Sequence, residues 1–177
     1  MMKTTTADAH RPDIHIRPTT GIDDMEDVIH IHGRAWRAAM RRVLPLETLE
    51  QTTIDADEDL CRAWLANIND KTDRFFVAVD RDDTPLGYIH LRVGDGNEAT
   101  IESHMVDPDR WREGIGTALL EHGLDELPEH IETVTLEMVT GNGVARQFYE
   151  HHGFELIGYE RMTIDDEVYP VSVYRCS

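Results

Sequence analysis

The order of β-rich and helical segments from residue 75 onward is the feature that most constrains the fold of this chain. Three β-rich runs come first, at residues 75–79, 85–93 and 99–106. Short polar turns separate these runs, so they predict an antiparallel meander. After Pro108 apolar residues recur at helical spacing as far as Leu127, and residues 131–139 again favour a strand. A meander that continues through a helical crossover predicts a mixed sheet with helices on both faces.

The flanking segments extend this layout. Residues 13–18 alternate between apolar and polar side chains and predict a strand. A helix that Asp23 or Asp24 caps should follow, and then a second helical stretch over residues 45–68. The C-terminal part predicts a helix over residues 142–152 and strands over 154–163 and 167–174. The expected fold class is α+β, with three layers (α/β/α) in which helices flank a mixed, mostly antiparallel central sheet.

The length of 177 residues fits one domain that can bury a core of its own. No segment resembles an interdomain linker, so we expect a single domain over residues 13–177 and a polar, disordered tail over residues 1–12. The two cysteines, Cys61 and Cys176, form no metal or redox motif and are expected as reduced thiols. The N-terminus has no apolar signal segment, so a cytoplasmic location is the expectation.

The charge of the chain argues against two classes of partner. Its 35 acidic and 17 basic residues give a formal net charge of −18. This charge repels the phosphates of nucleic acids and anionic lipid heads, so neither nucleic acid nor membrane is an expected partner. Lys3 and Lys71 are the only lysines. Such an acidic, lysine-poor surface is typical of a salt-rich cytosol (a halophilic type), and attraction of a cationic substrate is the alternative explanation.

The segment from Val106 to Leu120 is the sharpest local motif. Gly114 and Gly116 stand where a strand passes into a helix, and the unpaired N–H groups of a first helical turn favour phosphate. A dinucleotide-binding Rossmann fingerprint would need Gly or Ala at the position of Leu119 and a tighter turn. The GxxxxGK[ST] phosphate loop is also absent, so an NAD-binding Rossmann protein is only a third hypothesis.

Two segments together resemble the GCN5-related N-acetyltransferase (GNAT) family. Val106-Asp107-Pro108, followed by the two glycines, is similar to that family's strand ending Val-x-Pro and its [Arg/Gln]-x-x-Gly-x-Gly/Ala helix start. Residues 136–155 resemble its Leu-Glu-Val…Asn…Ala…Phe-Tyr…Gly-Phe segment. Trp111 replaces the family's usual Arg or Gln three residues before the first glycine. The resemblance is strong over residues 74–160 and weaker over residues 13–45.

The resemblance implies an acetyl-CoA site. The backbone amides that would cradle the pyrophosphate belong to Arg112, Glu113, Gly114, Ile115, Gly116 and Thr117. Met105 and Val106 would pair their backbone with the pantetheine arm, as an added strand does. Asn142 is expected first as a helix cap and second as a cofactor contact.

The catalytic candidates follow from the chemistry of acetyl transfer from sulfur to nitrogen. Tyr149 can protonate the departing thiolate as a general acid. Glu137 or Glu102 can take the proton of the amine, and partial burial would raise the pKa of Glu137 toward a useful value. The absence of a direct base is a further alternative. Trp36 and Met40, one helical turn apart, are expected to line the acceptor cleft or to form part of the core.

The histidines do not predict a metal site. His30 and His32 point to different sides of a helix, and His151 and His152 are adjacent at a helix end. His104, within the strand that would carry the cofactor, is expected as a packed or rim residue. We therefore expect acetyl-CoA as a co-substrate and no metal.

The leading functional hypothesis is an acetyl-CoA-dependent N-acetyltransferase. It would move an acetyl group directly to a primary amine of a small molecule or of a peptide or protein, without a covalent enzyme intermediate. A non-catalytic acyl-CoA sensor or partner-binding module on the same fold is the alternative. The sequence leaves the acceptor and the oligomeric state open, including a homodimer.

Overall fold

The computed structural model describes residues 13–51 and 56–177, and a seven-stranded sheet forms its centre. The predicted tail over residues 1–12 lies outside the described residues. The strands are β1 (His15–Pro18), β2 (Asp73–Val79), β3 (Pro85–Val93), β4 (Glu98–Val106), β5 (Thr133–Val139), β6 (Glu155–Ile164) and β7 (Glu167–Cys176). Their order in the sheet is β1-β2-β3-β4-β5-β7-β6, and every pair is antiparallel except β4 and β5, which are parallel.

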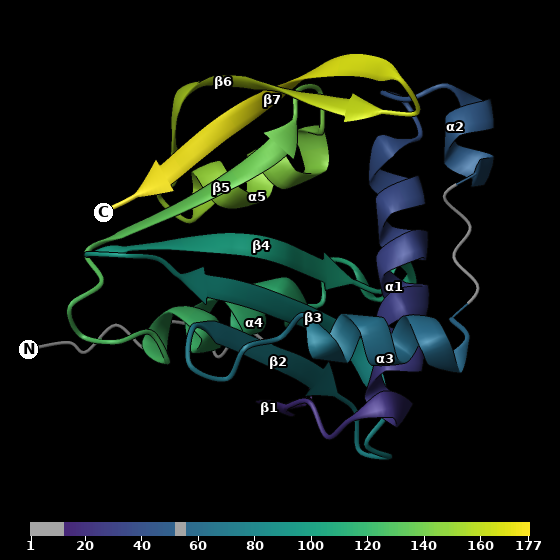
Figure 1. Cartoon of the computed structure of the whole chain (residues 1–177), viewed down its shortest axis with the longest axis vertical. Helices are drawn as coiled ribbons and strands as arrows, with labels where there is room; N and C mark the ends of the chain where they lie inside the picture. The colour runs from purple at the N-terminus through teal and green to yellow at the C-terminus, as the bar shows by residue number, and fades with distance from the viewer. Residues whose placement is uncertain (1–12, 52–55) are drawn as a thin grey trace, which may run out of the picture.

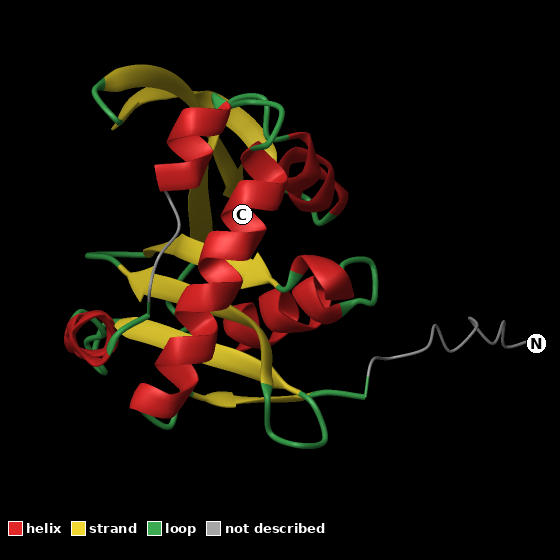
Figure 2. Cartoon of the chain, turned by 90° about the vertical axis from the view of Figure 1, so that its right-hand side faces the viewer, coloured by secondary structure: helices red, strands yellow, loops and turns green. Residues whose placement is uncertain are grey.

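Helices cover both faces of this sheet. They are α1 (Ile22–Met40), α2 (Leu46–Gln51), α3 (Glu58–Ala66), α4 (Ile115–Asp125) and α5 (Gly143–His151), with a short 3₁₀ helix, η1 (Pro108–Arg110). Figures 1 and 2 show α1 and α3 on one face and α4 and α5 on the other. The predicted fold class, a three-layer arrangement around a mixed and mostly antiparallel sheet, is confirmed.

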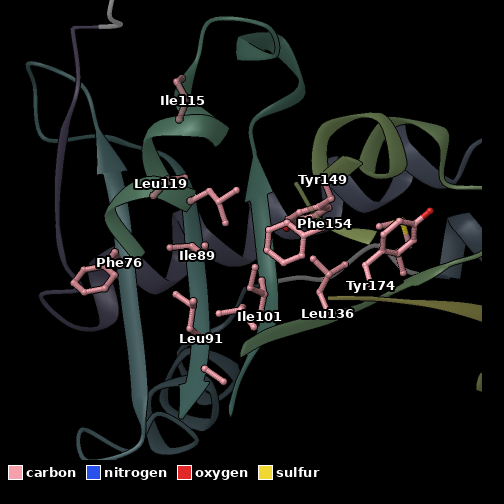
Figure 3. Packing of buried hydrophobic residues seen from close by; sticks show 14 of the residues in the cluster. Phe76, Ile89, Leu91, Ile101, Ile115, Leu119, Leu136, Tyr149, Phe154 and Tyr174 are labelled. Atoms are coloured by element: carbon pink, nitrogen blue, oxygen red, sulfur yellow. The ribbon is translucent and has the colours of Figure 1, made fainter. Parts of the chain in front are cut away.

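Two apolar clusters hold the layers together, because alternate residues of the central strands face opposite helices. Figure 3 shows the cluster between the sheet and helices α4 and α5, where Ile89 and Leu119 pack near Tyr149 and Phe154. The second cluster lies between the sheet and helices α1 and α3 and includes Tyr88.

The start of α1 differs from the prediction. The N-cap residue is Gly21, and no side chain caps the helix, so the prediction that Asp23 or Asp24 caps it is wrong. Asp24 is buried instead, where its carboxylate accepts hydrogen bonds from Arg17 at 2.8 Å and from the N–H of Thr20 at 2.7 Å. Burial raises the pKa of Asp24, but these hydrogen bonds outweigh burial and hold the pKa below its usual value.

The predicted helical stretch over residues 45–68 is divided. Helices α2 and α3 occupy its two ends, and residues 52–55 between them lie outside the described residues. The described part of the chain therefore has five α-helices, one more than predicted.

A β-bulge at Glu102 separates β4 from β5. On β4, Ser103 pairs with His90 of β3 and Ile101 pairs with Leu91, so Glu102 is an extra residue without a partner in β3. The parallel pairing of β4 with β5 runs only from Glu98 to Ile101 and ends at this bulge. Beyond it the two strands diverge, as Figure 1 shows.

Candidate active site

A cavity of about 970 Å³ lies where β4 and β5 diverge. Residues 101–106 of β4 and 136–139 of β5 form two of its walls. The start of α4, one side of α5, the C-terminal half of α1 and the end of β6 also line it. The cavity thus connects the two faces of the sheet, which gives two molecules a place to meet from opposite sides.

Along the end of β4, the backbone N–H and C=O groups of one residue point toward β3, and those of the next residue point toward the cavity. The N–H of Asp107 donates to the C=O of Leu86 in β3 at 2.8 Å, which fixes this alternation. The backbone groups of Met105 therefore also face β3, and those of Val106 face the cavity. The prediction that Met105 pairs its backbone with the pantetheine arm is wrong, because β3 already uses those groups. The backbone N–H of Val106 is available to a ligand.

Trp111 has a role that sequence analysis missed. Its indole Nε1–H donates to the backbone C=O of Val106 at 2.8 Å. This contact ties the loop before α4 to the end of β4. The replacement of the family's usual Arg or Gln by Trp111 therefore adds a structural hydrogen bond beside the predicted coenzyme site.

The loop that leads into α4 presents a series of free backbone donors. The first helical hydrogen bond runs from the N–H of Ala118 to the C=O of Gly114 at 3.0 Å. Among the described residues, none accepts a hydrogen bond from the six N–H groups of residues 112–117. Arg112 and Gly114 have left-handed backbone conformations, with φ of 67° and 84°, and these turn successive N–H groups toward one side. A helix start of this kind binds anions, above all phosphate groups.

The side chains of this loop point elsewhere. Glu113 forms an ion pair with Arg110, and the side chain of Ile115 is buried. The hydroxyl of Thr117 lies 3.2 Å from Nε2 of His152. Gly116 lies against Phe148, and a Cβ atom at Gly116 would come within 3.4 Å of that ring. The loop therefore offers a ligand its backbone rather than a set of charged side chains.

Tyr149 lies in the second turn of α5, and its phenol oxygen is 2.8 Å from Nδ1 of His104. Burial raises the pKa of Tyr149, so the phenol keeps its proton at neutral pH. Burial lowers the pKa of His104 to about 4, since it outweighs a contact with the backbone of Gly116 that raises this pKa, and His152 adds a smaller lowering, so the imidazole is neutral. His104 is packed, as predicted, against Phe148, with ring centroids 5.4 Å apart. Its contact with Tyr149 was missed.

The two candidate bases occupy different environments. Glu137 is exposed on the cavity wall, so the partial burial expected for it is not found. Its side chain is on the face of β5 opposite to the buried Leu136 and Met138. On that face Glu137 borders the cavity. Glu102 also borders the cavity, but its carboxylate lies 3.5 Å from the guanidinium of Arg92.

Helix α1 supplies the other wall of the cavity. Trp36 is half-buried and lines it, as predicted. The prediction that Met40 lines the acceptor cleft is wrong, because Met40 is fully buried in a small cluster with Leu44, Leu49 and Val139. One turn beyond Trp36, helix α1 has passed the cavity and packs against the chain that follows it.

Two other polar groups near the cavity have defined hydrogen bonds. Asn142 is the cap of α5, since its side-chain oxygen accepts from the N–H of Ala145 at 3.1 Å, and it also borders the cavity. Tyr88 links His32 and Ser103 through two hydrogen bonds of 2.6 Å, a chain that sequence analysis missed. Burial lowers the pKa of His32, so this ring is also neutral at pH 7.

Over residues 13–51 and 56–177, no cluster of three or more His, Cys, Asp or Glu side chains is arranged to hold a metal ion. Within the same residues, no helix has the length and apolar character needed to cross a bilayer.

The mixed sheet thus parts between two parallel strands, beside a helix start whose N–H groups have no partner among the described residues. The model of the Acetyltransferase (GNAT) family matches residues 25–154, so the chain belongs to this family. The family predicted from the motifs is thereby confirmed.

Curated relatives agree with this assignment over part of their length. The chain is 39% identical over 77 residues to the [ribosomal protein bS18]-alanine N-acetyltransferase of Escherichia coli (strain K12), covering 43% of this chain and 49% of the relative. It is 31% identical over 133 residues to mycothiol acetyltransferase of Clavibacter sepedonicus, covering 75% of this chain and 40% of the relative. The alignments thus span half or less of the length of these relatives.

Solved structures agree with the fold over nearly the whole chain. The PaiA N-acetyltransferase of Thermoplasma acidophilum, solved in complex with coenzyme A, superposes with a TM-score of 0.68 and 21% identity. The match covers 90% of this chain and 97% of that protein. At this identity the likeness establishes the fold.

Proposed function

We propose that this chain is an acetyl-CoA-dependent N-acetyltransferase that transfers acetyl directly from the coenzyme to a primary amine. The six free N–H groups of residues 112–117 are the observation that carries the proposal. They suit the pyrophosphate of the coenzyme, because a diphosphate offers several acceptor oxygens to donors on one side. The cavity between β4 and β5 gives the pantetheine arm a place beside the outward backbone of Val106.

The proposed reaction uses groups that already border the cavity. The amine nitrogen attacks the thioester carbonyl, a C–N bond forms, and the C–S bond breaks. The N–H of Val106 faces the cavity and can stabilise the developing oxyanion. The departing thiolate takes the phenol proton of Tyr149, which then regains a proton from solvent. Catalysis would come from positioning and from these donors.

Glu137 is the better candidate for the base. Its carboxylate lies on the cavity wall, and it has no ion-pair partner among the described residues. Glu102 lies 3.5 Å from the guanidinium of Arg92, so its carboxylate already has an ion-pair partner. We therefore assign to Glu137 the proton that the amine must lose, which passes from there to solvent.

The acceptor side of the cavity combines an apolar wall with a negative charge. Trp36, Met162 and Ile164 border the cavity together with Glu137. This combination suits an ammonium group next to an apolar substituent, as in a peptide terminus or an alkylamine. The relatives named for a ribosomal-protein alanine and for mycothiol support acetyl transfer without deciding between these acceptors. A cytoplasmic location and a homodimer stay predictions.

The test begins with coenzyme binding. Acetyl-CoA and CoA should raise the melting temperature and NAD should not, and a screen of amines should then release free thiol from acetyl-CoA. Gly116→Trp should abolish the shift, because a large side chain there must displace Phe148. Gly116→Ala is the matched control, since its Cβ would make near-normal contacts. A chain that does not bind acetyl-CoA contradicts the proposal.

Tyr149→Phe separates catalysis from binding. The variant should bind acetyl-CoA normally and lose turnover, because the phenol proton is missing. Full turnover by Tyr149→Phe across the pH range would show that this tyrosine is not the acid. Normal coenzyme binding without thiol release by any amine would favour the acyl-CoA sensor.

A further inference from the structure

Two consecutive hydrogen bonds beside the cavity have no part in the proposed reaction. The phenol oxygen of Tyr88 lies 2.6 Å from Nδ1 of His32 and 2.6 Å from Oγ of Ser103. Tyr88 is buried, whereas His32 and Ser103 both border the cavity. Among the described residues, Tyr88 is the only hydrogen-bond partner of the Ser103 hydroxyl. A buried phenol thus holds a hydroxyl at the cavity wall.

The bulge at Glu102 decides which face of the sheet this hydroxyl occupies. Ile101 belongs to the cluster between the sheet and helices α4 and α5, and in a regular strand Ser103 would share its face. Ser103 instead contacts Tyr88, which belongs to the cluster on the side of α1 and α3. Trp36 of α1 borders the cavity from that side, so Ser103 lies on the acceptor side.

Glu137 lies on the same face, on the strand across the split. Its neighbours Leu136 and Met138 belong to the cluster on the side of α4 and α5, so the side chain of Glu137 points to the opposite face. Ser103 of β4 and Glu137 of β5 therefore flank the divergence of the two strands on its acceptor side. One strand offers a hydroxyl there and the other a carboxylate.

The chemistry of the three groups sets the direction of the two hydrogen bonds. A phenol is a stronger acid than the hydroxyl of serine, and an imidazole lone pair is the most basic acceptor of the three. Tyr88 therefore donates its O–H to Nδ1 of His32, and Ser103 donates its O–H to the phenol oxygen. Burial raises the pKa of Tyr88, and the hydrogen bond with Ser103 lowers it, as a donor to the phenol oxygen does. Burial lowers the pKa of His32, so the ring is neutral at pH 7 and Nδ1 can keep its lone pair.

This direction leaves the lone pairs of Ser103 facing the cavity, because its proton is engaged by Tyr88. A primary amine that attacks a thioester has one lone pair and two N–H groups. The lone pair must point at the thioester carbon, so the two N–H groups need acceptors on either side. Glu137 can accept one N–H and Ser103 the other. A secondary amine has a single N–H and cannot use both acceptors.

We propose that Ser103 is an amine-binding residue that selects primary over secondary amines, and that Tyr88 is the positioning residue that keeps the lone pairs of Ser103 toward the amine. The proposal rests on the proposed function, because it needs an amine that attacks acetyl-CoA. It adds a second acceptor beside Glu137 and leaves the assigned proton transfers unchanged.

The first test compares two amines that differ by one N–H. The primary amine that reacts fastest in the amine screen is measured beside its N-methyl derivative. Ser103→Ala should lower kcat/KM for the primary amine about tenfold, the effect of one hydrogen bond. For the N-methyl derivative, kcat/KM should stay within about twofold, and so should the affinity for acetyl-CoA. Ser103→Thr keeps the hydroxyl and should keep the preference for the primary amine.

A double-mutant cycle tests the part of Tyr88. Tyr88→Phe should reduce the preference for the primary amine as Ser103→Ala does, because the proton of Ser103 loses its acceptor, and the double variant should lose no more. The control is Thr100→Val, which removes a β4 hydroxyl that lies 3.3 Å from that of Thr135 and does not border the cavity. This variant should leave the preference unchanged. Equal losses with both amines in Ser103→Ala would overturn the proposal, because the effect would then be structural.

The second test observes the direction of the hydrogen bonds without turnover. Protein labelled with ¹⁵N-histidine is studied at pH 7 by long-range ¹H–¹⁵N correlation, and His32→Gln identifies the ring. We expect a neutral ring with its proton on Nε2. A proton on Nδ1 would overturn the proposal, because Tyr88 would then donate to Ser103, and the O–H of Ser103 would compete for the lone pair of the amine. A wild type that acetylates no amine would instead contradict the proposed function and, with it, the role of Ser103, while the tautomer result would still stand.

Discussion

Deletion of Glu102 should close the cavity by removing the bulge. After deletion, Ser103 would follow Ile101 directly, and both would keep their present partners in β3, His90 and Leu91. The ladder between β3 and β4 would therefore become regular without any exchange of side chains. The cause of the divergence between β4 and β5 would be gone, so β4 could continue along β5.

The expected gain in stability can be worked out from the strands. Three residues of β5 follow the last pair, at positions 137–139, and residues 103–105 of β4 could pair with them. At about 1 kcal/mol net for each hydrogen bond, three new bonds give up to about 3 kcal/mol. For a chain of this size that corresponds to a rise of about 6–12 °C in melting temperature. Paired strands lie about 4.8 Å apart, and a third strand between them needs twice that distance, so no room would be left for the pantetheine arm.

Calorimetry and acetyl-CoA titration would measure both consequences. The deletion variant should melt higher than the wild type and bind acetyl-CoA at least about 100-fold more weakly, an estimate of about 2.7 kcal/mol in binding. Glu102→Ala is the matched control, because it keeps the bulge and removes only the carboxylate near Arg92. Native affinity in a folded deletion variant, or failure of the variant to fold, would refute the idea that the bulge holds the cleft open.

Three further predictions concern stability and binding. His104→Leu and Tyr149→Phe should each lower the free energy of unfolding in urea by about 1–3 kcal/mol, because each leaves one partner of their hydrogen bond unpaired. The double variant removes both partners, so it should lose much less than the sum of the two single variants. Burial raises the pKa of Asp73, but hydrogen bonds from the Asn69 backbone, His90 and Arg92 outweigh it, so its folded pKa lies below the unfolded value of 3.8. The stability that the ionised Asp73 provides is therefore complete above pH 3.8 and is lost as pH falls below that value. In urea unfolding, the free energy of unfolding of Asp73→Asn should be below that of the wild type at pH 7, and this difference should be smaller at pH 3. Acetyl-CoA titrations at rising NaCl should show tighter binding, because salt screens the repulsion between the net charge of −18 and an anionic coenzyme, and weaker binding would contradict this.

The layered fold could be predicted because its signals are local. The meander over residues 75–106 alternates with polar turns, and the helix after Gly114 has a regular apolar period. Such patterns depend only on neighbouring residues, so the bounds of β2, β3 and β4 lie within two residues of those predicted. The cap of α1 could not be predicted in this way, because Asp24 accepts a hydrogen bond from Arg17 of β1 and does not cap the helix.

The candidate site was only partly predictable, because the bulge changes which residues face the cavity. Ala99 and Ile101 face α4, and a regular strand would place Ser103 and Met105 on that same face. The extra residue shifts the alternation by one, and His104 takes that face instead, against Tyr149. A run of three adjacent polar residues, at positions 102–104, is the trace that this shift leaves in the sequence.

The same shift explains why the site coincides with the places where the protein leaves its own hydrogen bonds unmade. The bulge ends the ladder, so the cavity-facing N–H of Val106 has no partner in β5. The left-handed residues before α4 leave six amides free, and the shifted alternation leaves Nε2 of His104 alone. The cost of an unmade hydrogen bond is clearest at Nε2 of His104, which is shut off from solvent, whereas residues 112–114 are exposed and their amides can keep their hydrogen bonds to water. Local rules of stable folding are broken at all three, and all three border one cavity, which is the pattern expected where a ligand completes the hydrogen bonding.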